Sequence, residues 1–229
     1  MNGKYEKEDK LIVSVDCIIF GFDKEELKIL LIKRGFKPEK GKWSLLGGFL
    51  KKNEILDAAA IRILHSLTGL HNVYMEQLET YSDIDRDPVE RTISVAYSAL
   101  INIHDHNEEL SKEYSAKWFS INKYPKLIFD HNLMVNRAIR RLKYKATVQP
   151  VGFELLPEKF TMRQLQKLYE AIFNEKLDKR NFSRKILSMG LLTRLSEKDM
   201  DSSKRGSFLY KFDREKYISK LSDGITFKL

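Results

Sequence analysis

Short runs of apolar, often β-branched residues alternate with polar turns through the first 120 residues of the chain. Runs of this length, bounded by glycine, proline or clustered charge, are typical of β-strands, and those without polar positions indicate strands buried on both faces. We therefore expect strands at residues 11–22, 27–34, 43–50, 75–81, 92–101 and 116–119. The stretches between them are expected to form turns and polar loops.

Helical spacing occurs twice in the same region. Residues 54–68 place apolar side chains nearly all round a helix axis, which indicates packing on more than one side, and Gly69 suits the C-cap. Residues 130–144 have one apolar side, and Asp130 is the expected N-cap. Strands and helices in this order predict an α/β sandwich, a mixed sheet between helices, over residues 8–146.

The pattern changes after residue 146. Residues 147–157 contain two prolines and a glycine and are predicted to be a linker. Thr161 and Gln164 form a capping box that opens one helix, and Asp178 caps a second helix after a short turn. Two later strand-like runs enclose a polar tip. This order predicts a winged helix-turn-helix domain over residues 158–229.

Composition narrows the class of protein. The 229 residues are 42% hydrophobic and 32% charged, no apolar run approaches the roughly 20 residues that span a bilayer, and no secretory signal is recognisable. A single cysteine, Cys17, suits a reducing compartment, so we expect a cytoplasmic protein with no membrane partner. Residues 150–229 hold 17 basic against 11 acidic side chains, which favours nucleic acid as a partner.

One stretch has a recognisable frame. Gly48, Glu54, Arg62, Gly69 and Leu70 follow the spacing G-x5-E-x7-R-x6-G-apolar. This spacing resembles the Nudix box, the loop–helix–loop with which Nudix hydrolases bind a divalent metal and a nucleoside diphosphate. The resemblance implies a Nudix fold for the N-terminal domain.

The box lacks the metal ligands of that family. Where the family pattern has three glutamates, this chain has Ile63, Ser66 and Leu67. Side chains at i, i+3 and i+4 share one helix face, so carboxylates there would converge on a cation, whereas isoleucine and leucine offer no oxygen. We expect no metal, no other cofactor and no catalysis. The alternative is an active hydrolase with displaced ligands, for which the candidates are Glu54, Asp57 and Glu90.

The second helix of the C-terminal domain is the candidate DNA reader. Arg180 and Asn181 have the donors and acceptors that suit guanine and adenine. The candidates for phosphate contact are Lys179, Arg184, Lys185, Lys204 and Arg205. The runs PEKFT, LQKLYEAI and LDKRNF resemble the C-terminal domain of Nudix-related transcriptional regulators of the NrtR type. The same basic face could instead be merely solvated, in an interaction module without a regulatory role.

The two resemblances imply a regulator in which a small effector weakens operator binding. We expect a homodimer on a palindromic operator, because one reading helix covers few base pairs. The candidate effector contacts are Arg34, Trp43, Gly47, Gly48 and Glu54, although Trp43 could instead pack on the core. The resemblance offers L-arabinose, the effector of the AraR branch, or ADP-ribose. Without a metal to grip a diphosphate, the sequence favours L-arabinose.

Overall fold

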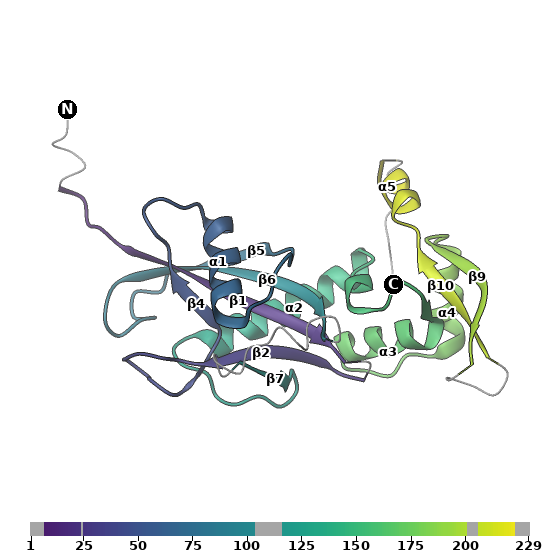
Figure 1. Ribbon diagram of the computed structural model, residues 1–229, viewed down its shortest axis with the longest axis horizontal. Coiled ribbons are helices and arrows are strands. Elements are labelled where there is room, and N and C mark those ends of the chain that lie inside the picture. Colours follow the sequence, from purple (N-terminus) through teal and green to yellow (C-terminus); the bar gives the residue numbers. More distant parts are fainter. Residues whose placement is uncertain (1–6, 24, 104–115, 201–205, 223–229) are drawn as a thin grey trace.

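The computed structural model describes the chain except for residues 1–6, 24, 104–115, 201–205 and 223–229. Figure 1 shows two lobes, a larger N-terminal one built around a sheet and a smaller C-terminal one that ends in a hairpin and a helix. No helix in the described part of the chain is both long and apolar enough to cross a membrane.

The N-terminal lobe is built on one mixed sheet. Its strands are β1 (Ile12–Phe22), β2 (Leu27–Lys33), β3 (Trp43–Ser44), β4 (Leu46–Phe49), β5 (Glu76–Tyr81), β6 (Thr92–Asn102) and β7 (Lys117–Ser120). The strand order is β3-β2-β1-β6-β5, with β4 paired to β1 and β7 paired to β2. β1 runs parallel to β6 and antiparallel to β2 and β4, which confirms the mixed sheet. The strand predicted at 43–50 is two strands, since β3 pairs with β2 and β4 with β1.

Alternate side chains of β1 enter two separate cores, as the period of two in a strand requires. Cys17 and Ile19 pack with α1 (Leu56–Thr68), while Ile18 and Phe20 pack with α2 (His131–Val148) on the other face. The sheet therefore lies between helices, as predicted. The expectation that α1 packs on more than one side is wrong, because its outer face is solvated and Ile61 is 58% exposed.

The segment predicted as a linker is folded. α2 continues to Val148, and a 3-10 turn, η4 (Phe153–Leu155), follows it. Leu155 belongs to the same buried cluster as the α2 side chains and the core of the C-terminal lobe. Gly152 has a φ of 87°, and a Cβ there would lie 2.9 Å from Leu168 Cδ2, so both the backbone and the space require glycine. The two lobes are therefore joined through packed apolar side chains.

The C-terminal lobe is the predicted winged helix-turn-helix. Its elements are β8 (Phe160–Thr161), α3 (Met162–Phe173), α4 (Lys179–Ser188), β9 (Leu192–Asp199), β10 (Ser207–Phe212) and α5 (Arg214–Ser222), with the strands in the order β8-β10-β9. The capping box at Thr161 and Gln164 is present, and the Asp178 carboxylate accepts the Asn181 N–H at 2.8 Å. The sequence prediction omitted β8 and α5, and the strand-like run that it placed at residues 191–195 ends four residues before β9 does.

Candidate ligand cavity and nucleic-acid interface

A cavity of about 400 Å³ opens beside Gly47 and Gly48 of β4. Its walls come from β1, the end of β2 and the loop after it, β3, β4, α1, the 82–91 loop, the start of β6 and the N-terminal turn of α2. Three of the five predicted effector residues line it: Arg34, Gly47 and Gly48. It also gathers Asp16, Arg86 and His131, which sequence reasoning missed.

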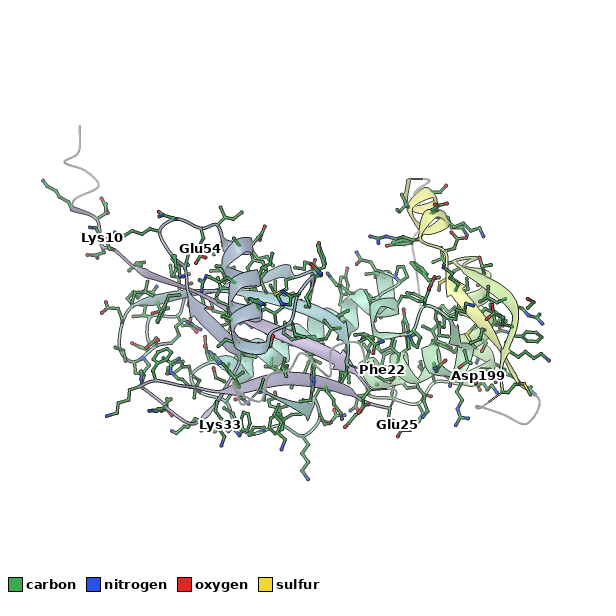
Figure 2. All side chains as sticks on the ribbon, in the orientation of Figure 1. Lys10, Phe22, Glu25, Lys33, Glu54 and Asp199 are labelled. Atoms are coloured by element: carbon green, nitrogen blue, oxygen red, sulfur yellow. The ribbon has the colours of Figure 1, made fainter. Side chains whose placement is uncertain are left out.

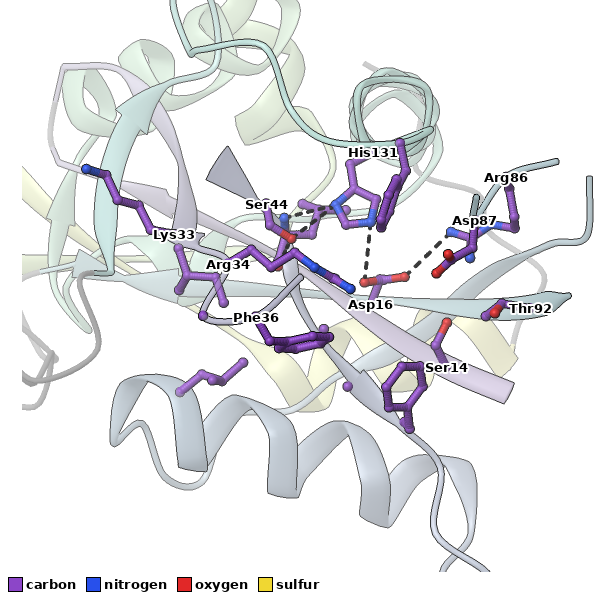
Figure 3. A pocket seen from close by; sticks show the side chains of 18 residues that line it. Ser14, Asp16, Lys33, Arg34, Phe36, Ser44, Arg86, Asp87, Thr92 and His131 are labelled. Atoms are coloured by element: carbon purple, nitrogen blue, oxygen red, sulfur yellow. Dashed lines mark hydrogen bonds and ion pairs between the residues drawn. The ribbon is translucent and has the colours of Figure 1, made fainter. Parts of the chain in front are cut away.

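Arg34 projects into this cavity between two aromatic rings (Figure 3). Its guanidinium carbon lies 4.0 Å from the ring centre of Phe36 and 5.2 Å from that of Phe129. Its Nε is buried and has no hydrogen-bond partner among the described residues. Burial lowers the pKa of Arg34, and nearby carboxylates, Asp87 most, act in the opposite direction. A buried donor without an acceptor is costly, so this position favours a ligand that brings an anionic oxygen.

A buried ionic network forms the cavity wall behind Arg34 (Figure 3). The Arg86 guanidinium donates to both carboxylate oxygens of Asp130, at 2.9 and 3.0 Å. Asp16 lies 3.8 Å from Arg86 and accepts the Ser94 hydroxyl at 2.5 Å. Asp130 is the N-cap residue of α2, as predicted, but its side chain makes no capping hydrogen bond. Both of its carboxylate oxygens accept from Arg86 instead.

His131 completes the network as a neutral imidazole. The Leu45 N–H donates to His131 Nδ1 at 3.2 Å, so Nδ1 acts as the acceptor and the ring proton is on Nε2. Nε2 lies 3.7 Å from the Asp16 carboxylate. Burial lowers the pKa of His131 despite the nearby acids Asp16 and Asp130. The ring therefore adds polarity to the wall but no charge at pH 7.

The paired glycines allow this close packing. A Cβ on Gly47 would lie 2.3 Å from Asp16 Oδ1, and one on Gly48 would lie 3.0 Å from Ile63 Cγ1. Any side chain at Gly47 would collide with a carboxylate that is already held by three neighbours. Glycine is thus needed here because the buried network occupies the space of a side chain. The absence of a side chain also lets a ligand approach the backbone.

Two predicted effector residues, Glu54 and Trp43, are not among those that line the cavity. The Glu54 carboxylate is held by Arg62, at 2.5 and 2.8 Å, and by the Lys51 N–H, and it does not line the cavity. These contacts lower the pKa of Glu54 to about 2, the Arg62 hydrogen bond most. Trp43 makes an edge contact with Phe119 at 4.8 Å and packs on the core, the alternative that its sequence position left open. Figure 2 places Glu54 at the turn before α1.

The Nudix fold implies a divalent cation beside α1, and the residues present do not fit one. Ile63 is 2% exposed in the core, Leu67 lines the cavity with an apolar side chain, and the Ser66 hydroxyl donates to a carbonyl of its own helix. Asp57 accepts the Tyr97 hydroxyl at 2.5 Å. The described residues contain no group of three acidic, histidine or cysteine side chains that could hold a metal ion, so Glu54, Asp57 and Glu90 do not converge.

The predicted DNA-reading helix, α4, presents its basic face to solvent. Five predicted contacts on it are exposed: Lys179, Arg180, Asn181, Arg184 and Lys185. Phe182 and Ile186 on the opposite face are buried in the cluster shared with α3. The Arg184 guanidinium donates to the Asn181 side-chain oxygen at 2.8 Å, which orders two candidate contacts before any partner binds.

The β9–β10 hairpin adds basic side chains that sequence reasoning missed. The Arg194 guanidinium carbon lies 3.5 Å from the ring centre of Phe208, and Lys198 Nζ lies 4.8 Å from the same ring. Both cations are exposed and lie four residues apart on the same face of β9. This spacing of basic residues is visible in the sequence. The predicted contacts Lys204 and Arg205, and the pair His104 and His106 in a predicted polar loop, lie outside the described residues.

Comparison with known proteins places both halves of the chain. The NUDIX domain family matches residues 10–142, and the NrtR DNA-binding winged helix domain family matches residues 152–212. An ADPR responsive transcriptional repressor, NtrR, of Acinetobacter baylyi is 32% identical over 220 residues, which cover 93% of this chain and 88% of that protein. An ADP-ribose pyrophosphatase of Methanocaldococcus jannaschii is 36% identical over 128 residues, 56% of this chain and 73% of that protein.

The fold of the whole chain is also similar to a solved structure. The crystal structure of Shewanella oneidensis NrtR complexed with a 27mer DNA has a TM-score of 0.78 and 29% identity, and the match covers 87% of this chain and 93% of that one. The similarity spans both lobes in the same order. None of these relatives is described as responding to an arabinose ligand, so the L-arabinose branch that the sequence favoured is unsupported.

Proposed function

This chain belongs to the family of Nudix-related transcriptional regulators of the NrtR type, and we propose that it is an ADP-ribose-responsive transcriptional repressor. Its Nudix domain binds ADP-ribose in the 400 Å³ cavity, and its winged-helix domain binds operator DNA. The binding of ADP-ribose weakens the binding of DNA. The Nudix domain acts in this proposal as a sensor and not as a hydrolase.

The single observation that carries the proposed ligand is Arg34. Its buried Nε lacks an acceptor among the described residues, and two aromatic rings flank the guanidinium. A diphosphate supplies the missing anionic oxygens, and an adenine or ribose ring can lie against the aromatic side chains. The cavity volume falls within the range of about 300–1,000 Å³ that is usual for small-molecule sites.

The preference for L-arabinose assumed that a diphosphate needs a metal for its binding. The cavity suggests another source of positive charge, because a guanidinium can bind phosphate oxygens without a cation between them. The relative named as ADPR responsive supports the same choice. The missing carboxylates of the Nudix box therefore bear on hydrolysis more than on recognition of the ligand.

The proposed DNA contact uses α4 and the β9–β10 hairpin. In this proposal Arg180 and Asn181 read base edges, while Lys179, Arg184 and Lys185 contact phosphates. Two copies of the chain bind a palindromic operator, since a single reading helix covers few base pairs. The release of DNA rests on a higher affinity of ADP-ribose for the arrangement of this homodimer that does not fit the operator.

Calorimetry with the full-length protein tests the ligand. ADP-ribose is expected to bind saturably, and Arg34→Gln to weaken it by about tenfold or more, as for the loss of a hydrogen bond to a charged group. Lys42→Gln, an exposed change in the same loop, is the matched control and is expected to leave the affinity unchanged. Binding of L-arabinose without binding of ADP-ribose would overturn the proposed effector.

Gel shifts with duplexes from the gene's own upstream region test the response. ADP-ribose is expected to release the duplex from the unaltered protein but not from the Arg34→Gln variant at the same concentration. Incubation with ADP-ribose and Mg²⁺ is expected to yield no AMP. Brisk release of AMP would support the alternative that the protein is a hydrolase. Failure to bind any upstream duplex would refute the proposal that it is a repressor.

A further inference from the structure

A second cavity, of about 260 Å³, lies where the Nudix domain meets the winged-helix domain. Its walls come from β1, β5, β6 and α2, from residues 149–151 after α2, and from Tyr217 of α5. It shares no lining residue with the first cavity. A ligand there would touch both domains at once.

The walls of this junction cavity divide into an apolar floor and a polar rim. The floor residues are Phe20, Leu78, Leu100, Ala138, Leu142 and Val151. The rim holds the hydroxyls of Ser98 and Tyr217 and the charged groups of Glu76, Arg141 and Lys145. This division fits a ligand with an apolar body and one polar end, and the ligand must be small, because the volume lies below the roughly 300–1,000 Å³ of most small-molecule sites.

The charged residues of the rim indicate the chemistry of the ligand's polar end. Glu76 and Lys145 form an ion pair with each other. Arg141 lies one helical turn before Lys145 on α2 and has no ion-pair or hydrogen-bond partner within the part of the chain that the structure describes. We propose that the junction cavity is a binding site for a small carboxylate with an aromatic or short aliphatic body, whose carboxylate pairs with Arg141.

The position of Tyr217 gives this site an effect on DNA binding. Its ring centre lies 6.0 Å from that of Phe212 at the end of β10, and Phe212 stacks on Phe153 of η4 at 4.2 Å. A ligand held between α2 and Tyr217 thus contacts the aromatic group that joins the hairpin to the segment between the domains. Occupancy favours one arrangement of the two domains and so changes operator affinity, independently of the ligand in the first cavity.

Benzoate is the probe, titrated into the full-length, ¹⁵N-labelled protein and followed by NMR. Saturable shifts are expected at residues that line the junction cavity. Arg141 is exposed, so Arg141→Gln is expected to weaken binding about two- to fivefold, the range for an exposed ion pair. Glu76→Gln is expected to strengthen it, because it removes a negative charge and releases Lys145 from its ion pair.

Two matched controls separate this site from general charge effects. Arg140→Gln, an exposed neighbour on α2 that lines neither cavity, is expected to leave benzoate binding unchanged. Benzamide, which has the same shape without the charge, is expected to bind more weakly than benzoate. Equal affinities for benzoate and benzamide, no effect of Arg141→Gln, or no saturable shift at the cavity would each overturn the proposal.

The Arg34→Gln variant separates this proposal from the proposed effector. Because the two cavities share no residue, this variant is expected to lose ADP-ribose and to keep benzoate. Loss of benzoate in the same variant would place the probe in the first cavity and refute the junction site. Failure of the unaltered protein to bind ADP-ribose would refute the proposed effector but would not affect the proposal of the junction site.

Discussion

Replacement of Arg86 by methionine tests the network behind the ligand cavity. The Arg86 side chain is 3% exposed and contacts both oxygens of Asp130, and Asp16 lies 3.8 Å away. Removing one partner of a buried ion pair costs about 3–5 kcal/mol, because the remaining charge stays buried without its counterion. Asp130 is 16% exposed and Asp16 keeps the Ser94 hydroxyl, so we expect a loss near the lower end, about 3 kcal/mol.

Urea unfolding followed by tryptophan fluorescence measures this loss. The two tryptophans of the chain, Trp43 and Trp118, both belong to the Nudix domain, so the signal reports that domain. Arg137→Met is the matched control, because its ion pair with Glu79 has side chains that are 41% and 45% exposed. An exposed pair contributes less than about 1 kcal/mol. The reasoning fails if Arg86→Met destabilises the domain no more than Arg137→Met does.

Three further predictions concern the cavity wall and the basic face of α4. Burial lowers the pKa of His131, so the unfolded chain takes up the proton first as pH falls. The contribution of His131 to stability is therefore complete above the unfolded pKa and is lost as pH falls through about 6.5. In urea unfolding between pH 5 and 8, His131→Gln reduces the dependence of stability on pH, and the exposed His71→Gln does not. Gly47→Ala costs about 1–3 kcal/mol in the same unfolding assay and weakens effector binding in calorimetry, because its Cβ would lie 2.3 Å from Asp16 Oδ1. Lys179→Gln lowers the slope of operator affinity against salt concentration, both on logarithmic scales, by about one unit and leaves the sequence preference unchanged. Arg180→Gln instead relaxes the preference at one base pair. Gel shifts over a salt series with base-substituted duplexes distinguish the two variants.

Local chemistry was predictable from the sequence where the interaction spans a few residues. The capping box at Thr161 and Gln164, the Asp178 cap and the left-handed Gly69 all occur as predicted. The strand β1 was predictable too, because its run is short and rich in apolar and β-branched residues, which is typical of a largely buried strand. These signals fixed the order of elements, and that order identified both domains.

The ligand cavity was only partly predictable, because its chemistry depends on long-range pairing. Asp16 and Ser94 face each other only because β1 lies beside β6 in parallel. Arg86 reaches Asp130 from a loop 44 residues away along the chain, and nothing in the local pattern signals that contact. A partial signal did exist, since Asp16 is an acidic residue inside an apolar run and a buried carboxylate requires partners. The sequence analysis did not use this signal, and the signal alone does not name the partners of Asp16.

The prediction of a sensor from a degenerate Nudix box gains a physical basis in the way the box packs. The parts that fold the loop are kept, since Glu54 and Arg62 pair and Arg62 also donates to the Phe49 carbonyl at 3.0 Å. At the first of the three missing glutamates, Ile63 packs beneath Gly48 in the core. A glutamate there would bury a carboxylate among apolar side chains, at a cost that its neighbours do not offset. Restoration of the three glutamates would therefore strain the fold, because the space once suited to a cation now belongs to the core. Loss of the metal ligands and retention of the cavity are thus compatible, since Leu67, at the third of the three positions, lines the cavity with an apolar side chain.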